Sequence, residues 1–344
     1  MVSAWVGAED PPRARPIVIA HRGASGERPE HTLESYRLAI EQGADFVEPD
    51  LVSTRDGVLV CRHENEISGT TDVASRPEFA SRRATKAIDG ASVTGWFTED
   101  FTLAEIKTLR ARERLPRLRG TAFDGRFELP TFDEVLALVA SANARPERRG
   151  RPVGVYPETK HPSYFQGLGL ALETPLLEAL RRKGLDRKDA PVFIQSFEVQ
   201  NLRALARLTP VALIQLIDAE GRPWDFTGGR SYADMIRPAG LHDIAGYARG
   251  LGVHKGLVVP RDSSGRSLPP TTLVRNAHAA GLLVHVWTLR AENEFLPAEL
   301  RRGQEPSARG DMASEATLFL EAGVDGLFTD HPAIGLAARA AFDR

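Results

Sequence analysis

The feature that most constrains the fold of this chain is an alternation of short apolar runs with segments of helical periodicity. Ile17–His21 is a β-branched run, and residues 32–42 after it carry apolar side chains at helical spacing until Gly43 ends the pattern. Because this strand-then-helix unit recurs along the chain, the sequence favours a parallel sheet with helical connections. We predict eight strands, at residues 17–21, 45–50, 153–158, 192–196, 211–217, 256–260, 283–288 and 325–329.

Eight such units predict an α/β fold, the (β/α)8 TIM barrel. Helices between the strands are predicted at residues 32–42, 173–183, 199–208, 272–280 and 314–322. The alternative is an open doubly wound sheet, although no G-x-G-x-x-G motif follows the first strand to favour a dinucleotide-binding version. The length of 344 residues suits a single barrel domain over residues 17–340 with insertions.

Two segments interrupt the alternation. Asp56-Gly57 predicts a tight hairpin turn after the second strand. Residues 64–129 beyond it are rich in arginine, too polar for a core element and too long for a plain loop. We therefore predict an insertion after strand two that caps the barrel mouth and narrows the substrate range. A second excursion is expected at 218–240, and residues 1–16 are expected to be a flexible N-terminal segment.

Composition excludes several classes of protein. The chain has 44 lysines and arginines and 46 aspartates and glutamates. The resulting net charge of −2 lacks the excess of positive charge that non-specific nucleic-acid binding requires. No stretch approaches the roughly 18 consecutive apolar residues of a transmembrane helix. Cys61 is the sole cysteine, so no intrachain disulfide can form. Residues 1–16 lack a signal-peptide pattern, which fits a cytoplasmic protein, or a periplasmic or secreted one whose signal peptide was removed.

Acidic residues stand where the predicted strands end, on the face of such a barrel that carries active sites. Glu48 and Asp50 lie two residues apart on the second strand, so their side chains face the same way, and Glu158 ends the third strand. Close carboxylates repel one another unless a cation or a shared proton intervenes. Three carboxylates suit Ca²⁺ or Mg²⁺, and we predict that these residues bind such a divalent metal ion.

Histidines and cationic residues occupy the neighbouring strand ends. His21 ends the first strand, and His63 ends the hairpin strand that follows the second. Imidazole titrates near neutrality, so we predict that these two residues are the general acid and base of a phosphodiester hydrolase. Arg22 and Lys160 stand beside the carboxylates and are predicted to bind the phosphate monoanion.

Other aromatic residues and histidines receive weaker predictions. Phe197 and Trp287 follow later strands and are predicted to form an apolar wall for an alcohol moiety, with ordinary packing as the alternative for Phe197. His31 precedes an expected helix N-cap and is interpreted as mostly structural, whereas His285 lies inside a strand and should be buried. The histidines on or beside helices are expected at the surface, namely His242, His254, His278 and His331.

The strand-end motifs form an ordered set. They are His21-Arg22-Gly23-Ala24-Ser25-Gly26, Pro29-Glu30-His31-Thr32, Glu48-Pro49-Asp50, His63-Glu64-Asn65, Glu158-Thr159-Lys160, Gln195-Ser196-Phe197, Trp287-Thr288 and the segment 326–332. In this order they resemble the glycerophosphodiester phosphodiesterase family over about residues 17–340, and most closely its periplasmic bacterial branch. The chain departs from the family pattern at His31, where most relatives have asparagine, and at Pro49 between the two acids.

The resemblance implies a (β/α)8 fold and metal-dependent hydrolysis of glycerophosphodiesters to glycerol 3-phosphate and an alcohol. It implies the same roles for the metal ligands Glu48, Asp50 and Glu158, the acid–base pair His21 and His63, and the phosphate ligand Arg22. Neither of the first two strands ends in serine or cysteine, so the attacking oxygen is expected to come from water or from the substrate itself.

Three other functions are alternatives for this chain. A phospholipase C-like phosphodiesterase needs a membrane-facing apolar rim, which the polar segment 64–129 does not offer. A metal-dependent amidohydrolase usually begins with H-x-H, whereas this first strand ends in His21-Arg22-Gly23. A non-enzymatic ligand-binding barrel is the third alternative, and the complete set of expected catalytic residues argues against it. The sequence assigns no oligomeric state.

Overall fold

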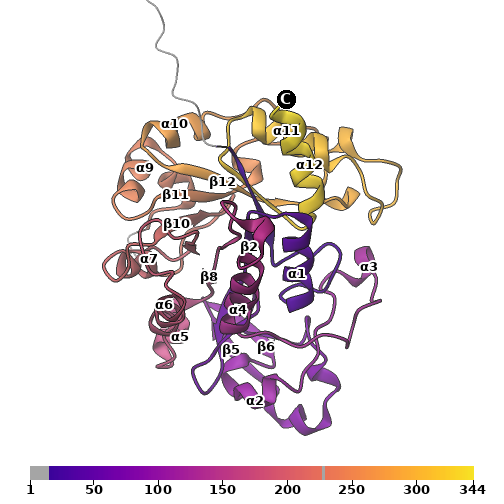
Figure 1. Ribbon diagram of the computed structural model, residues 1–344, viewed down its shortest axis with the longest axis vertical. Helices are drawn as coiled ribbons and strands as arrows, with labels where there is room; N and C mark the ends of the chain where they lie inside the picture. Colours follow the sequence, from indigo (N-terminus) through magenta and orange to yellow (C-terminus); the bar gives the residue numbers. More distant parts are fainter. Residues whose placement is uncertain (1–14, 227–228) are drawn as a thin grey trace, which may run out of the picture.

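Parallel strands form one curved sheet through the centre of the molecule (Figure 1). The structure is a computed structural model that describes residues 15–226 and 229–344. Of the predicted N-terminal segment 1–16, residues 1–14 lie outside the described residues. The parallel strands are β1 (Ile17–His21), β2 (Phe46–Glu48), β3 (Asp50–Ser53), β7 (Gly154–Val155), β8 (Glu158–Thr159), β9 (Phe193–Ser196), β10 (Ala212–Ile217), β11 (Gly250–His254), β12 (Leu283–Leu289) and β13 (Gly326–Thr329).

Hydrogen-bonded neighbours join these strands into a ring. β2 and β3 are the two halves of the second strand, and they pair with β7 and β8, the two halves of the third. Pairing then continues from β8 through β9, β10, β11 and β12 to β13, which pairs with β1. β1 pairs with β2. With each divided strand counted once, the described chain has eight parallel strand positions, an α/β fold of the TIM-barrel type.

The sixth strand was predicted at the wrong place. The prediction of 256–260 followed the apolar residues there, but a 3-10 helix (Lys255–Leu257) occupies the start of that stretch. The strand is β11, whose five residues precede this helix. Gly250 and Gly252 made β11 look unlike a strand. A Cβ at Gly252 would lie 2.6 Å from Leu216 Cδ2, so the neighbouring strand leaves no room for a side chain.

Helices connect the strands on the outside of the ring (Figure 1). They are α1 (Leu33–Gln42), α4 (Phe132–Asn143), α5 (Pro162–Gly167), α6 (Glu173–Arg182), α7 (Val199–Leu205), α8 (Tyr232–Met235), α9 (Pro238–Ala245), α10 (Leu273–Ala279), α11 (Met312–Glu321) and α12 (Pro332–Phe342). The five predicted helices are present, with bounds shifted by up to three residues. The predicted excursion 218–240 contains α8 and the start of α9, so it is partly helical. No described helix has the length and apolar character that crossing a membrane requires.

The predicted hairpin follows the second strand. β4 (Leu59–Cys61) pairs antiparallel with β3 around the Asp56-Gly57 turn. Residues 64–129 then contain β5 (Ala84–Ile88), β6 (Ala91–Gly95), α2 (Leu103–Ile106) and α3 (Pro116–Arg119). Figure 1 shows β5, β6 and α2 together at the lower end of the view. The expectation that this excursion is too polar for the core was wrong, because its buried side chains join the main core cluster, among them Ile67, Phe101, Ile106 and Leu109.

A smaller cluster fills the inside of the ring. Ile19, Tyr156, Ile214 and Phe328 are buried there, each from a different strand position or its immediate continuation. The Tyr156 hydroxyl lies 2.8 Å from Nδ1 of His285, which comes from β12 on the far side of the ring. His285 is buried, as predicted. This layer forms the floor of the cavity described next, since Phe328 lines that cavity as well.

Candidate active site

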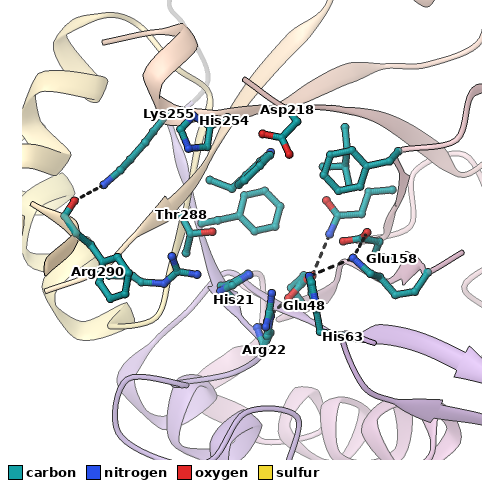
Figure 2. Close-up of a pocket in the computed structure, with 17 residues that line it drawn as sticks. His21, Arg22, Glu48, His63, Glu158, Asp218, His254, Lys255, Thr288 and Arg290 are labelled. Carbon is teal, nitrogen blue, oxygen red and sulfur yellow. Dashed lines mark hydrogen bonds and ion pairs between the residues drawn. The ribbon is translucent and has the colours of Figure 1, made fainter. Parts of the chain in front are cut away.

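A cavity of about 400 Å³ opens where the parallel strands end. Figure 2 shows His21, Arg22, Glu48 and His63 gathered at one side of it with Glu158 beside them, and Asp218 and His254 at the opposite side. Eight of the nine predicted site residues line the cavity, namely His21, Arg22, Glu48, His63, Glu158, Lys160, Phe197 and Trp287. The ninth, Asp50, is buried directly behind them, within 4.8 Å of the other carboxylates.

Glu48, Asp50 and Glu158 form a compact carboxylate cluster. One oxygen from each lies within 4.8 Å of the others, and all three side chains are buried. Pro49 separates β2 from β3 without turning the chain, so Glu48 and Asp50 keep the same facing. The register pairs Asp50 with Glu158 across β3 and β8, which brings in the third carboxylate. The strand pattern thus brings three carboxylates close together.

Hydrogen-bond donors hold each carboxylate. The backbone N–H of Arg22 donates to Glu48 Oε2 at 2.8 Å, and Gln195 Nε2 donates to Glu48 Oε1 at 3.1 Å. Lys160 Nζ donates to Glu158 Oε1 at 2.8 Å. The third carboxylate is approached by a histidine, since Nε2 of the fully buried His31 lies 2.9 Å from Asp50 Oδ2. The sequence-based expectation named Arg22 and Lys160 as partners and did not foresee the other two donors.

The three carboxyl groups are not equally acidic. Burial and the charges of Asp50 and Glu158 raise the pKa of Glu48 well above its usual value. Burial likewise raises the pKa of Glu158 to about 8, although Lys160 opposes the rise. Burial opposes ionisation of Asp50 as well, but Lys160 and the hydrogen bond from His31 bring its pKa well below the usual value. The positive charges around the cluster are therefore too few to keep all three carboxylates ionised at the same time.

Unpaired polar atoms in the same place fit a divalent cation and an anion bound beside it. Among the described residues, Asp50 Oδ1, Gln195 Oε1 and Arg22 Nε are buried and have no hydrogen-bond partner. A buried polar atom without a partner costs free energy, on the order of 1–3 kcal/mol, unless a ligand supplies one. The oxygen donor set is the one that Ca²⁺ and Mg²⁺ prefer, so the residues present fit the predicted ion.

Each of the two predicted catalytic histidines has a carboxylate partner at Nδ1. His21 Nδ1 lies 2.6 Å from Asp330 Oδ1, and His63 Nδ1 lies 2.5 Å from Glu64 Oε1. Asp330 is ionised, because Arg290 and Arg119 bring its pKa well below the usual value against the effect of burial. An ionised carboxylate only accepts hydrogen bonds, so Nδ1 of His21 carries the proton and Nε2 keeps its lone pair.

Both imidazoles are neutral around pH 7. Burial and the charge of Arg22 lower the pKa of His21 to about 4 and that of His63 to about 3. Nε2 of His63 lies 3.2 Å from Lys160 Nζ, which can donate only to an unprotonated nitrogen. The two residues therefore adopt the same tautomer, with the proton on Nδ1, and the Nε2 lone pair of His63 accepts the hydrogen bond from Lys160.

The end of β1 turns sharply to bring Arg22 to the cavity. Arg22 has a φ of 58° and Gly23 a φ of 90°, both in the left-handed region. A Cβ at Gly23 would lie 2.4 Å from Ser35 Oγ, so only glycine fits at this position. The Arg22 guanidinium donates to Glu30 Oε2 at 3.0 Å and lies 3.4 Å from Asp50 Oδ2. A non-glycine residue in this backbone conformation is uncommon outside functional sites.

Aromatic rings form part of the cavity wall. Phe197 and Trp287 pack edge to face with ring centroids 5.9 Å apart, and His254 packs against Trp287 at 5.1 Å. The expectation that His254 lies on the surface was wrong. His254 is the last residue of β11, the strand that was predicted at the wrong place, and it lines the cavity. His331 was also expected at the surface, but it is buried beneath Gly26, where a Cβ would lie 2.3 Å from the imidazole.

A model of the glycerophosphoryl diester phosphodiesterase family matches residues 21–334. The chain belongs to this family. The glycerophosphodiester phosphodiesterase GDPD6 of Arabidopsis thaliana is 39% identical over 329 residues, which cover 92% of this chain and 84% of that protein. A glycerophosphodiester phosphodiesterase of Haemophilus influenzae is 30% identical over 344 residues, covering 93% and 88%. In fold the chain is similar to an Oleispira antarctica phosphodiesterase, with a TM-score of 0.60, 22% identity and coverage of 96% and 97%.

The sequence analysis did not identify several residues around the site of this glycerophosphoryl diester phosphodiesterase family member. Asp330 directly follows β13, so the strand-end rule that identified Glu48 would have found it as well. Glu64 follows His63 and was quoted only as part of a motif. Two arginines of the excursion 64–129, Arg114 and Arg119, reach Glu64 and Asp330, and nothing in their local sequence distinguishes them from the surface arginines around them.

Proposed function

We propose that this protein hydrolyses glycerophosphodiesters to glycerol 3-phosphate and an alcohol in a metal-dependent reaction, with His21 and His63 as the acid–base pair. The observation that carries the proposal is the pair of imidazoles, each with an unprotonated Nε2, beside a cluster of three buried carboxylates at one cavity. The relatives named above are glycerophosphodiester phosphodiesterases, and the Oleispira antarctica phosphodiesterase is in complex with the product sn-glycerol-3-phosphate.

In this proposal the cavity binds the substrate in two parts. Glu48, Asp50 and Glu158 would hold Ca²⁺ or Mg²⁺, which when bound supplies positive charge to the phosphate and polarises its oxygens. Arg22 and Lys160 bind the remaining phosphate oxygens, and the free Nε of Arg22 is one donor available for them. Phe197 and Trp287 contact the carbon atoms of the substrate.

The nucleophile in this proposal is the substrate hydroxyl on the carbon next to the phosphorylated one. Its oxygen forms a bond to phosphorus while the bond from phosphorus to the alcohol oxygen breaks. The hydroxyl proton passes to Nε2 of one histidine, and the other histidine, protonated beside the phosphate anion, gives a proton to the departing alcohol. Water then opens the cyclic phosphate to give glycerol 3-phosphate. No serine or cysteine lines the cavity among the described residues.

Release of glycerol 3-phosphate from glycerophosphocholine tests the proposed function directly. The purified protein with Ca²⁺ or Mg²⁺ should release glycerol 3-phosphate and choline in equal amounts. Because the geometry supplies an acid, a base and an anion site, no further cofactor should be needed. If a folded, metal-loaded sample releases neither product from any of several glycerophosphodiesters, the proposed function is wrong.

His21→Ala and His63→Ala are each expected to lower kcat by about 10²–10⁴-fold, the usual effect of removing a general acid or base. Both side chains lie at the open end of the barrel, so the variants should keep the wild-type unfolding temperature within a few degrees. His242→Ala is the matched control, because His242 is exposed and lies outside the cavity. Wild-type kcat in either variant would show that the histidine has another role.

We also propose that the excursion 64–129 caps the barrel mouth, since it reaches cavities on two sides of the site. The tip of the β5–β6 hairpin places Asp89 in a cavity that it shares with Lys160 and Phe197. On the other side, residues 114–118 border a cavity that shares Phe295 with the central one. The cap thus borders the routes that a bulky alcohol group would take.

Shortening the β5–β6 hairpin is expected to change the preference among alcohol groups. Deleting Ala87, Ile88, Ala91 and Ser92 removes two residue pairs and keeps Asp89-Gly90 as the turn, closing on the Lys86–Val93 pair. The value of kcat/KM for a bulky diester, divided by the value for glycerophosphocholine, should rise by about tenfold. This is the change in specificity expected when one contact between a pocket and its substrate changes. An unchanged ratio in a folded variant would exclude a capping role for this hairpin.

A further inference from the structure

Two arginines at the ends of one short segment of the excursion each reach the carboxylate partner of a different site histidine. Arg114 precedes α3 and Arg119 ends it, five residues further on. Their partners follow different strands, since Glu64 follows the hairpin strand β4, which pairs with β3, and Asp330 follows β13, which pairs with β1. The segment 114–119 therefore reaches the carboxylate partners of both histidines.

The first contact path leads from Arg119 to His21. Arg119 Nη2 donates to Asp330 Oδ2 at 2.6 Å, and the other oxygen of the same carboxylate accepts from His21 Nδ1 at 2.6 Å. Arg119 is itself fixed by Glu292 Oε1 at 2.6 Å and by the Ser25 carbonyl at 2.9 Å. Its side chain is only 8% exposed. Three acceptors in three directions leave the guanidinium a single orientation.

The second contact path leads from Arg114 to His63. Arg114 donates to both oxygens of Glu64, from Nη1 at 3.0 Å and from Nη2 at 2.6 Å. Glu64 Oε1 then lies 2.5 Å from His63 Nδ1. Arg114 also forks onto both oxygens of Glu30 at 2.7 Å, and Glu30 accepts from the guanidinium of Arg22. Arg114 thus stands behind His63 and Arg22 without lining the cavity.

We propose that Arg114 and Arg119 are positioning residues that set the tautomer and the orientation of the two histidines from outside the barrel. Arg114 holds Glu64, and Arg119 together with Arg290 Nε at 2.8 Å holds Asp330, in the rotamer that accepts the Nδ1 proton. This leaves Nε2 of each imidazole as the reactive atom. The inference rests on the proposed acid–base roles of His21 and His63. It assigns to the excursion a part in the chemistry itself, in addition to its proposed capping role.

A purely structural role makes different predictions. If these ion pairs only joined the excursion to the barrel, losing one would lower stability and leave kcat unchanged in the fraction that stays folded. If they position the histidines, kcat falls while substrate binding is kept, because neither arginine lines the cavity. The effect must also vanish once the carboxylate between arginine and histidine has been removed.

The experiment compares R114Q, R119Q and R112Q in the full chain with metal, using glycerophosphocholine. Arg112 lies two residues before Arg114, is exposed, and its side chain has no ion pair or hydrogen bond within the described part of the chain, so R112Q is the matched control. We expect R114Q and R119Q each to lower kcat by about 10–100-fold, as loss of such outer partners does, with KM within about threefold. R112Q should match the wild type.

Double variants then test the two paths separately. Adding R119Q to D330N should lower kcat by less than about twofold further, whereas R119Q added to E64Q should show its full effect. Because Arg114 also holds Glu30, R114Q is added to the double variant E30Q/E64Q, where it too should lower kcat by less than about twofold further. Unfolding temperatures are measured for each variant, and R119K and R114K serve where a glutamine variant does not fold. Lysine keeps the charge but cannot hold several acceptors at once, so kcat should fall in these variants too.

A readout without turnover completes the test. Imidazole ¹⁵N shifts distinguish the two neutral tautomers, and we expect the Nδ1-protonated form of His21 to be lost in R119Q and kept in R114Q, with the reverse for His63. Wild-type kcat and unchanged tautomers in folded R114Q and R119Q would overturn the inference. If the wild-type protein itself releases no glycerol 3-phosphate, the proposed function fails, and the tautomer measurement still decides the positioning of the histidines.

Discussion

Removal of divalent metal by a chelator is expected to abolish release of glycerol 3-phosphate, and addition of Ca²⁺ or Mg²⁺ to restore it. Glu48, Asp50 and Glu158 bring oxygens within 4.8 Å of one another, and Lys160 is the one ammonium group that pairs with the cluster in the described chain. Without a divalent cation the raised pKa values of Glu48 and Glu158 favour protonated carboxyl groups, which cannot organise a phosphate. Full activity of a metal-stripped sample would contradict this prediction.

A variant of the cluster separates loss of the ion from other effects of the chelator. Glu48→Gln should weaken calorimetrically measured binding of Ca²⁺ or Mg²⁺ by at least about tenfold, the lower end of what disturbing a metal site costs. Glu173→Gln is the control, since Glu173 is also buried but is held by Gln166 and Asn201 and does not line the cavity. Equal metal affinity of the two variants would exclude Glu48 as a ligand.

A substrate analogue that lacks only the hydroxyl next to the phosphorylated carbon is expected to lose at least about 10³-fold in kcat. A well-placed intramolecular nucleophile has an effective concentration of about 10⁵–10⁸ M, which no water molecule in the same cavity can match. KM should change far less, because Arg22 and Lys160, which line the cavity, would in the proposed binding mode hold the phosphate, and the analogue keeps that group. Both diesters must carry the same alcohol group, so that the departing oxygen is equally basic.

The size of the residual rate decides between the two nucleophiles. Turnover of the analogue within about tenfold of the parent would mean that water attacks phosphorus directly. A large loss with the transient appearance of a cyclic phosphate from the parent, followed by phosphorus NMR, would support attack by the neighbouring hydroxyl. His21→Ala and His63→Ala should then both slow the formation of that cyclic product.

The strand-end argument worked because it depends on local sequence alone. A parallel strand followed by a helix places its last residues at one face of the barrel whatever the rest of the chain does, so Glu48, Asp50 and Glu158 were brought together as predicted. β11 was not predicted because it lacks the side chains that are usual in a strand. Glycine is required at positions 250 and 252 because Leu283 and Leu216 leave no room for a side chain, and these contacts come from the neighbouring strands.

Contacts between segments far apart in the chain could not be predicted from the sequence for a related reason. Arg119 and Asp330 are 211 residues apart, and an arginine in a polar segment has the same local pattern whether it is exposed or pairs with a buried carboxylate. His31 was interpreted as mostly structural from its place before a helix cap, and it is buried, but its bond to Asp50 depends on where β3 lies. Such partners become visible only when the fold places them.

The ion pairs of the segment 114–119 have a consequence for chimeras within the family. Replacing residues 64–129 by the corresponding stretch of another member removes Arg114 and Arg119 but leaves Glu30, Glu292 and Asp330 behind as buried carboxylates. A buried carboxylate that loses a cationic partner costs more free energy than a lost surface contact, even though Arg22 stays beside Glu30 and Arg290 beside Asp330. A grafted excursion should therefore fold stably on this barrel only if it carries arginines at the matching positions.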